Sequence, residues 1–204
     1  MKKVLFATTN PAKVVRFKEA LLEHDIELIS IKDLDPEDQF DVDETSNDPL
    51  ENAYLKAKAY YDKLKMPTIA MDCTLYLDDV PDEVQPGAHV RRINGKRLND
   101  KEIIDYYSNL VSKYGKEYDG EKRLYAAWRY GLVLLDNGER YDLRWERRRF
   151  YYVEKPNPYY EEGYPLDSIS KYISTNEYYR YENKQSDERR EEVEFVISKL
   201  GKSV

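Results

Sequence analysis

The first thirty residues alternate between short apolar runs and polar breaks. Residues 4–8 are mainly apolar and are followed by polar residues, which predicts a short buried β-strand. Asn10 is a favoured N-cap residue and Pro11 fits the first position of a helix. Apolar residues then recur at helical spacing, so we predict a helix over residues 10–23. A second strand is predicted over residues 27–31.

The next segment begins with an acidic stretch, which is followed by a helical pattern. Residues 33–48 are rich in Asp and Glu and predict a turn-rich connection. Residues 49–64 place Leu, Ala and Tyr on one side of a second predicted helix. A short strand is predicted over residues 68–71 and is expected to end at Asp72.

The middle of the chain predicts a loop, a helix and a hairpin. Residues 78–98 contain several Pro and Gly residues and predict loops, whereas residues 99–114 have the apolar spacing of a third helix. Residues 124–135 and 140–153 are strand patterns. They are joined by Asp136-Asn137-Gly138-Glu139, and Asn-Gly between two such runs is a strong hairpin signal.

The last fifty residues predict irregular structure over residues 155–186 and a closing helix over residues 187–200. Helices and strands alternate early in the chain, and a long hairpin follows. This order predicts an α/β protein with a mixed sheet flanked by helices.

The composition excludes several classes of protein. Charged residues make up 36% and hydrophobic residues 41% of the 204 residues, which is typical of a globular chain. No apolar run approaches the roughly 18–20 residues of a membrane span, and the N-terminal run is too short for a signal peptide. We therefore expect a cytoplasmic protein with no membrane partner. A net charge of −7 disfavours a general nucleic-acid binder, although a metal held by carboxylates can still attract a small polyanion.

The Cys, His and Tyr residues narrow the chemistry further. Cys73 is the single cysteine, which excludes an internal disulfide. His24 and His89 are far apart, so a zinc site of the usual Cys/His type is not expected. A nucleophilic Cys73 is the weaker hypothesis because no His lies nearby in sequence to activate it. For the twenty tyrosines we prefer packing, with base stacking by one or two of them as the alternative.

One segment suits anion binding. Thr8, Asn10 and Lys13 lie where a predicted strand leads into the N-terminus of a helix, whose N–H groups and dipole attract anions. A triphosphate would suit such a site. The alternative is an ordinary strand–helix turn with a capping Asn and a solvated Lys.

Two further segments suit metal and phosphate chemistry. Glu44 and Asp72 offer oxygen ligands of the kind that Mg²⁺ takes together with water. Glu51 and Lys56 lie on the second predicted helix, five residues apart. For Glu44, Glu51 and Lys56 the alternative is a solvated acidic loop followed by a helix with surface charges, and for Asp72 it is a simple turn residue.

Taken together, these segments resemble the inosine triphosphate pyrophosphatase family. Its T-x-N-x-x-K motif is matched by Thr8, Asn10 and Lys13, and its E-T-G and E-N-A-x-x-K-A blocks are matched by residues 44–45 and 51–57. Its A-D-D-S-G-L block corresponds to residues 70–75, and its P-G followed by Arg corresponds to Pro86, Gly87 and Arg92. These blocks occur in the right order within roughly the first 95 residues.

The chain also departs from the family pattern. Met71 replaces the first Asp of the third block, and Cys73 and Thr74 replace Ser and Gly. Ser46 and Asp48 stand where Gly and Thr are usual. The G-F-G-Y-D loop is reduced to residues 163–167, and Arg189 is a weak match to a late S-H-R motif. The resemblance therefore supports phosphate and metal chemistry better than it supports inosine specificity.

The resemblance implies a fold, a reaction and a set of roles. The fold is a long mixed sheet in two lobes with a central cleft, formed by residues 1–204 as one domain. The reaction is hydrolysis of ITP, dITP or XTP to the monophosphate and pyrophosphate with Mg²⁺, in a homodimer. Asp72 is the implied catalytic residue, and the implied metal ligands are Glu44, Asp72 and Glu51. The implied phosphate contacts are Thr8, Asn10, Lys13 and Lys56. The implied contacts to the base or another part of the substrate are Tyr164, Asp167, Arg189 and Arg92. The alternatives are the same chemistry on other modified or pyrimidine nucleotides, or a nucleotide-binding protein with weakened catalysis.

Overall fold

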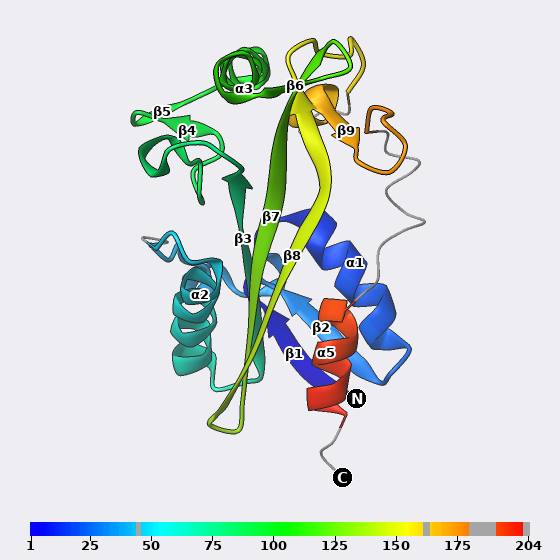
Figure 1. Cartoon of the computed structure of the whole chain (residues 1–204). Helices are drawn as coiled ribbons and strands as arrows, with labels where there is room; N and C mark the ends of the chain where they lie inside the picture. Colours follow the sequence, from blue (N-terminus) through cyan, green and yellow to red (C-terminus); the bar gives the residue numbers. More distant parts are fainter. Residues whose placement is uncertain (44–45, 161–163, 180–190, 202–204) are drawn as a thin grey trace. The chain divides into compact units, whose positions relative to one another are not determined.

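A computed structural model describes residues 1–43, 46–160, 164–179 and 191–201. Its main sheet has seven strands, and Figure 1 shows the long strands that run through it. The order is β2 (Ile26–Ser30), β1 (Lys2–Phe6), β3 (Thr68–Leu77), β7 (Glu121–Asp136), β8 (Glu139–Val153) and β9 (Ser170–Tyr172), with β6 (Lys116–Tyr118) paired to β7. β1 is parallel to β2 and β3, whereas β6 and β9 pair antiparallel with β7 and β8, so the sheet is mixed, as predicted.

The helices also follow the sequence pattern. They are α1 (Pro11–Leu22), α2 (Pro49–Leu64), α3 (Asp100–Tyr114) and α5 (Glu191–Leu200). Part of the predicted closing helix, residues 187–190, lies outside the described residues. A two-stranded hairpin, β4 (Arg92–Ile93) and β5 (Lys96–Arg97), occurs inside the predicted loop of residues 78–98. No helix among the described residues is long and apolar enough to span a membrane.

The predicted hairpin is confirmed, whereas β3 continues well beyond its predicted end. Asn137 and Gly138 join β7 to β8 with φ values of 51° and 80°, which are the left-handed values that a tight hairpin turn requires. β3, in contrast, does not end at Asp72 but continues to Leu77. It continues because β7 lies beside it, and because Leu75 and Leu77 are buried in a hydrophobic cluster.

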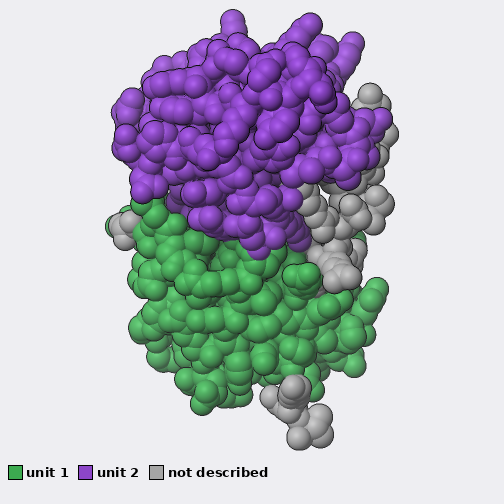
Figure 2. Space-filling view, viewed as in Figure 1, with its two compact units in different colours: residues 1–73, 130–145, 190–204 green, residues 74–129, 146–189 purple. Residues whose placement is uncertain are grey.

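The chain divides into two compact units, which Figure 2 shows in green and purple. Unit 1 contains residues 1–73, 130–145 and 190–204, and unit 2 contains residues 74–129 and 146–189. β3, β7 and β8 each contain residues of both units.

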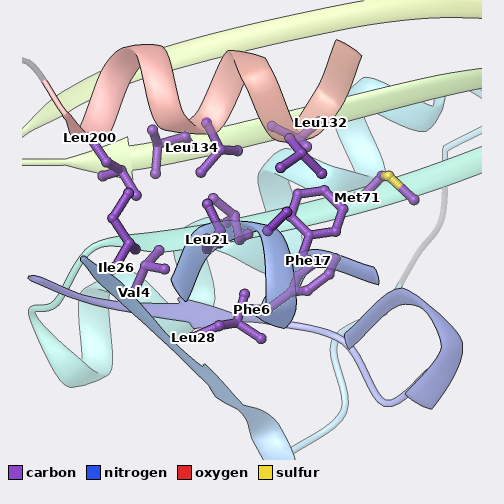
Figure 3. Close-up of a cluster of buried hydrophobic side chains, with 14 residues drawn as sticks. Val4, Phe6, Phe17, Leu21, Ile26, Leu28, Met71, Leu132, Leu134 and Leu200 are labelled. Atoms are coloured by element: carbon purple, nitrogen blue, oxygen red, sulfur yellow. The ribbon is translucent and has the colours of Figure 1, made fainter. Parts of the chain in front are cut away.

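Unit 1 has a hydrophobic cluster on each face of its part of the sheet. One cluster joins β1 and β3 to α1 and α5 and includes Phe6, Phe17 and Leu132 (Figure 3). The other joins alternate residues of the same strands to α2 and includes Leu5, Ala53 and Val133. Successive strand residues face opposite sides of a sheet, so this double burial explains the continuous apolar runs of residues 4–7, 69–71 and 132–135.

The hydrophobic cluster of unit 2 contains buried tyrosines, and further tyrosines pack against it. Tyr107 of α3 and Tyr152 of β8 are almost fully buried, and their rings lie 5.8 Å apart. Burial raises the pKa of both phenols, so both stay neutral. These tyrosines therefore serve packing, which is the role that we preferred from the sequence.

Candidate active site

The turn from β1 into α1 has the polar arrangement that the sequence predicts. Asn10 caps α1, because its side-chain oxygen accepts from the N–H of Lys13 at 3.4 Å and its carbonyl accepts from Val14 at 3.2 Å. The Thr8 hydroxyl accepts from the N–H of Asn10 at 3.2 Å. The N-terminus of α1 therefore lies directly beside Thr8 and Asn10.

Lys13 connects this turn to β3. Its ammonium group donates to the carbonyl oxygen of Met71 at 3.1 Å, one residue before Asp72. The ladder between β1 and β3 has already ended there, since its last bond runs from the N–H of Ala7 to the carbonyl of Ile69. Asp72 thus lies just beyond the carboxyl end of β1, although β3 itself continues past it.

The Asp72 carboxylate is held from the other side by α2. The Asn52 side-chain amide donates to Oδ2 of Asp72 at 2.9 Å. Asp72 is half-buried, whereas Asn52 is completely buried. Lys56 is four residues after Asn52 and lies on the same side of α2. The structure therefore places Asn52 in contact with Asp72, and Lys13 in contact with Met71, the residue before it.

The N-terminus of α2 carries its own carboxylate. Asp48 is the N-cap of α2 and accepts from the N–H of Leu50 at 2.9 Å. Arg144 of β8 donates two parallel N–H bonds to it, at 2.6 and 2.7 Å. The Arg144 bonds lower the pKa of Asp48, and the helix N–H groups of Leu50 and Glu51 lower it further. Asp48 therefore stays ionised and fixes the first turn of α2.

We predict that Asp48→Ala lowers the free energy of unfolding at pH 7 by about 1 kcal/mol, because a helix cap is lost. The Arg144 pair adds little, since its side chains are 56% and 41% exposed. The pKa of Asp48 is depressed on folding, so its contribution is present above the ordinary value of 3.8 and is lost as the pH falls through the folded value. Urea unfolding at pH 7 and at pH 3 measures both effects. Asp48→Asn, which keeps the cap acceptor, is the control, and an equal loss in both variants contradicts the cap.

The predicted metal ligands are only partly described. Glu44 lies outside the described residues. Glu51 is exposed. The hydrogen bond with Asp142 raises the pKa of Arg140, the hydrogen bond with Asp48 raises that of Arg144, and the negative charge of Glu51 adds a smaller contribution to both. In the part of the chain that the structure describes, no group of three or more Asp, Glu, His or Cys side chains is placed to hold a metal. Asp72 is therefore the carboxylate around which the described part of the site is arranged.

Met71 faces away from Asp72. Its side chain is 7% exposed and belongs to the apolar cluster with Phe17 and Leu132 (Figure 3). Neighbouring strand residues point to opposite faces, so Asp72 faces α2 and Met71 faces α1. A methionine at this position fills the core, and the polar contact of the residue is made by its carbonyl with Lys13.

The predicted base-binding residues belong to unit 2. Tyr164 is exposed and precedes a short 3-10 helix, Pro165–Ile169, in which the N–H of Asp167 donates to the Tyr164 carbonyl at 3.1 Å. Arg92 is exposed in the β4–β5 hairpin. The structure thus joins Tyr164 and Asp167 in one turn, while Arg92 comes from another segment. Arg189 and Gly163 lie outside the described residues.

Comparison with known proteins identifies the family to which these segments belong. A model of the Ham1 family matches residues 4–143, which is more than half of the chain. The chain belongs to the Ham1 family. The matched range includes Thr8, Lys13, Asn52 and Asp72, so the part of the candidate site around Asp72 lies inside the Ham1 match, whereas Tyr164 and Asp167 lie beyond it.

Three relatives of this Ham1 chain each carry the name dITP/XTP pyrophosphatase. The dITP/XTP pyrophosphatase of Aquifex aeolicus is 42% identical over 90 residues, which are 44% of this chain and 41% of that protein. The dITP/XTP pyrophosphatase of Oceanobacillus iheyensis is 38% identical over 105 residues, 52% of each chain. That of Bacillus subtilis is 29% identical over 80% of this chain and 78% of its own length. The chain spans about half the length of the first two relatives.

Solved Ham1 structures share the fold over nearly the whole chain. The Staphylococcus aureus Ham1 protein has a TM-score of 0.74 at 22% identity and covers 98% of this chain and 97% of its own. A HAM1 protein from Coxiella burnetii has a TM-score of 0.75 at 20% identity, with 98% and 99% covered. These matches confirm the long mixed sheet with flanking helices.

Sequence reasoning on this Ham1 chain missed the partners of its carboxylates. Asn52 belongs to the E-N-A block, but its contact with Asp72 needs α2 packed against β3. Asp48 directly before Pro49 is a recognisable helix start, so its capping role had a signal in the sequence. Its pairing with Arg144, 96 residues away, had none.

Proposed function

We propose that this chain is a nucleoside triphosphate pyrophosphatase, a hydrolase of acid anhydrides that acts on dITP, ITP and XTP. The observation that carries the proposal is the position of Asp72. Lys13 of α1 donates to the carbonyl of Met71, the residue before Asp72, and Asn52 of α2 donates to the Asp72 carboxylate. The names of the Ham1 relatives support the reaction and the substrate class.

The proposed chemistry is attack of water on the α-phosphorus, with pyrophosphate as the leaving group. Catalysis of phosphoryl transfer rests mainly on positioning and on neutralising charge. Lys13 and Lys56 neutralise the triphosphate, while Thr8, Asn10 and the N-terminus of α1 bind its oxygens. Asp72 orients the attacking water and accepts its proton.

A divalent metal, Mg²⁺ in our proposal, supplies further charge neutralisation when it is bound. Mg²⁺ takes one or two carboxylates and keeps several waters, so it does not require a cluster of three acidic side chains. The half-buried Asp72 carboxylate fits this need, and Glu44 and Glu51 are the other proposed ligands. Asn52 donates to Oδ2 of Asp72, so the other carboxylate oxygen would be the one that Asp72 offers to the ion.

The remaining parts of the proposal concern the base and the assembly. We assign recognition of the base or another part of the substrate to Tyr164, Asp167, Arg92 and Arg189. The proposed architecture is one domain of residues 1–204 in two lobes with a central cleft. We also propose a cytoplasmic homodimer that binds neither nucleic acid nor membrane. The altered segment of residues 163–167 motivates one competing proposal, in which the same chemistry acts on other modified or pyrimidine nucleotides.

The test is pyrophosphate release across ITP, dITP, XTP and the eight standard nucleoside triphosphates, with Mg²⁺ and with excess EDTA. We expect release selective for ITP, dITP and XTP, and loss of release in EDTA. Fast release from another nucleotide keeps the reaction and changes the substrate. Nucleotide binding without release from any member of the panel, by folded protein with Mg²⁺, contradicts the enzyme and favours a binding protein, an alternative that Met71 at the family Asp position motivates.

A further inference from the structure

Asn52 is the most completely enclosed polar side chain near Asp72. It lies in the first turns of α2 and is 0% exposed. Its amide nitrogen donates both to the carbonyl of Ser46 at 2.8 Å and to Oδ2 of Asp72 at 2.9 Å. Its amide oxygen accepts from the N–H of Ser46 at 3.0 Å. The side chain therefore joins the segment before α2, the helix itself and β3.

The main chain of Ser46 fixes the orientation of this amide. The two ends of an Asn amide have similar shapes, and the hydrogen-bond network decides which end points where. Ser46 offers one donor and one acceptor, and a flipped amide would place NH₂ against N–H and oxygen against C=O. The donor end must therefore face Asp72, whose carboxylate is an acceptor.

This arrangement gives Asn52 a defined effect on Asp72. A buried, oriented donor holds one carboxylate oxygen and so restricts the rotation of the side chain. The other oxygen then has a fixed direction. Groups that orient a metal-binding or catalytic side chain in this way are typically worth about 10–100-fold in metal affinity or activity.

We propose that Asn52 is a positioning residue that sets the geometry of the Asp72 carboxylate for the metal ion and the attacking water. The proposal rests on the proposed function, and it adds a residue to which no catalytic or binding role has been assigned above. Asn52 acts through Asp72, so its effect must disappear when Asp72 is removed.

The experiment is a double-mutant cycle with Asn52→Ala and Asp72→Asn, read in two ways. The first readout is the kcat and KM of nucleotide hydrolysis. The second is the dissociation constant of Mn²⁺ alone, measured by calorimetry, which needs no turnover. Asn52→Ser is a milder second variant in case the alanine variant does not fold, and circular dichroism checks the fold of each protein.

Tyr60→Phe is the matched control. Tyr60 also lies on α2 and is buried, and its hydroxyl likewise makes two bonds to the main chain of one residue, Phe40. Its loss removes the same kind of helix-to-loop contact without touching Asp72. We expect kcat and Mn²⁺ affinity in Tyr60→Phe to stay within about 3-fold of the wild type.

In the wild-type background we expect Asn52→Ala to lower kcat and Mn²⁺ affinity by about 10–100-fold, with KM changed by less than about 3-fold. In the Asp72→Asn background, the same substitution is expected to change either quantity by less than about 3-fold. Equal losses in both backgrounds, or normal Mn²⁺ affinity in Asn52→Ala, overturn the proposal, as does failure of the wild type to bind Mn²⁺. If the wild type binds Mn²⁺ but hydrolyses no nucleotide, the proposed function fails, and the Mn²⁺ cycle alone decides the role of Asn52.

Discussion

Asp72→Asn is expected to lower kcat for nucleotide hydrolysis by about 10³-fold or more, in the range found when a central catalytic carboxylate is removed. The amide carries no negative charge for a metal ion and is a poor acceptor for the proton of water. The fold is expected to survive, because the amide oxygen can still accept from Asn52 in place of Oδ2. Single-turnover and steady-state rates of pyrophosphate release measure the loss.

The control for this prediction is Asp62→Asn on α2. Asp62 is an exposed carboxylate that pairs with Lys58 one turn away, so its replacement removes a charge without touching β3. We expect normal activity in Asp62→Asn and nearly equal unfolding midpoints in wild type and Asp72→Asn. An Asp72→Asn protein with near-normal kcat would remove Asp72 from the mechanism.

Gly131→Ala is expected to lower the free energy of unfolding by about 2–3 kcal/mol or more. Gly131 lies in β7, where the N-terminus of α2 crosses it. An added Cβ would lie 2.4 Å from both Cα and N of Leu50 and 2.7 Å from the carbonyl carbon of Pro49. These are backbone atoms, so no side-chain rotation relieves the overlap, and the first turn of α2 must move. Chemical unfolding of the purified variant measures the loss.

The matched control is Gly138→Ala in the β7–β8 turn. An alanine Cβ there meets no atom within 4 Å, so its cost is limited to the backbone strain of a φ of +80°, about 1 kcal/mol. The structure predicts a clearly larger loss of unfolding free energy for Gly131→Ala than for Gly138→Ala. It also predicts weaker metal binding in Gly131→Ala, because Asn52 lies two residues after Leu50 in the displaced turn. Equal losses in the two variants would contradict the close packing of α2 on β7.

The sequence predicted those elements whose signals are local. α2 has the predicted bounds, because Asp48 and Pro49 start a helix and apolar residues recur along it. The β7–β8 turn was predicted by Asn137 and Gly138 for the same reason. β3 was predicted too short because the residues after Asp72 are mixed in type, and their strand conformation depends on β7, which lies more than forty residues later in the chain.

The same distinction between local and long-range signals applies to the candidate site. Thr8, Asn10 and Lys13 are neighbours in sequence, and the strand–helix pattern was enough to place them at one helix N-terminus. The contact between Asn52 and Asp72 joins two elements, and its geometry depends on how a buried amide is oriented by the main chain of Ser46. No periodicity or spacing contains that information.

Unit 1 is assembled from three separate stretches of the chain, and this has a consequence for biosynthesis. Lys13, Asn52 and Asp72 lie within the first 73 positions, yet their sheet is completed by residues 130–145 and one of its faces is covered by α5. A ribosome releases the chain from its N-terminus, so the nascent N-terminal third exposes apolar strands until the hairpin and the last helix emerge. Contacts over such sequence separations form slowly and leave aggregation-prone surfaces open. Truncated chains that end before α5 should therefore depend more on chaperones than the full-length protein does.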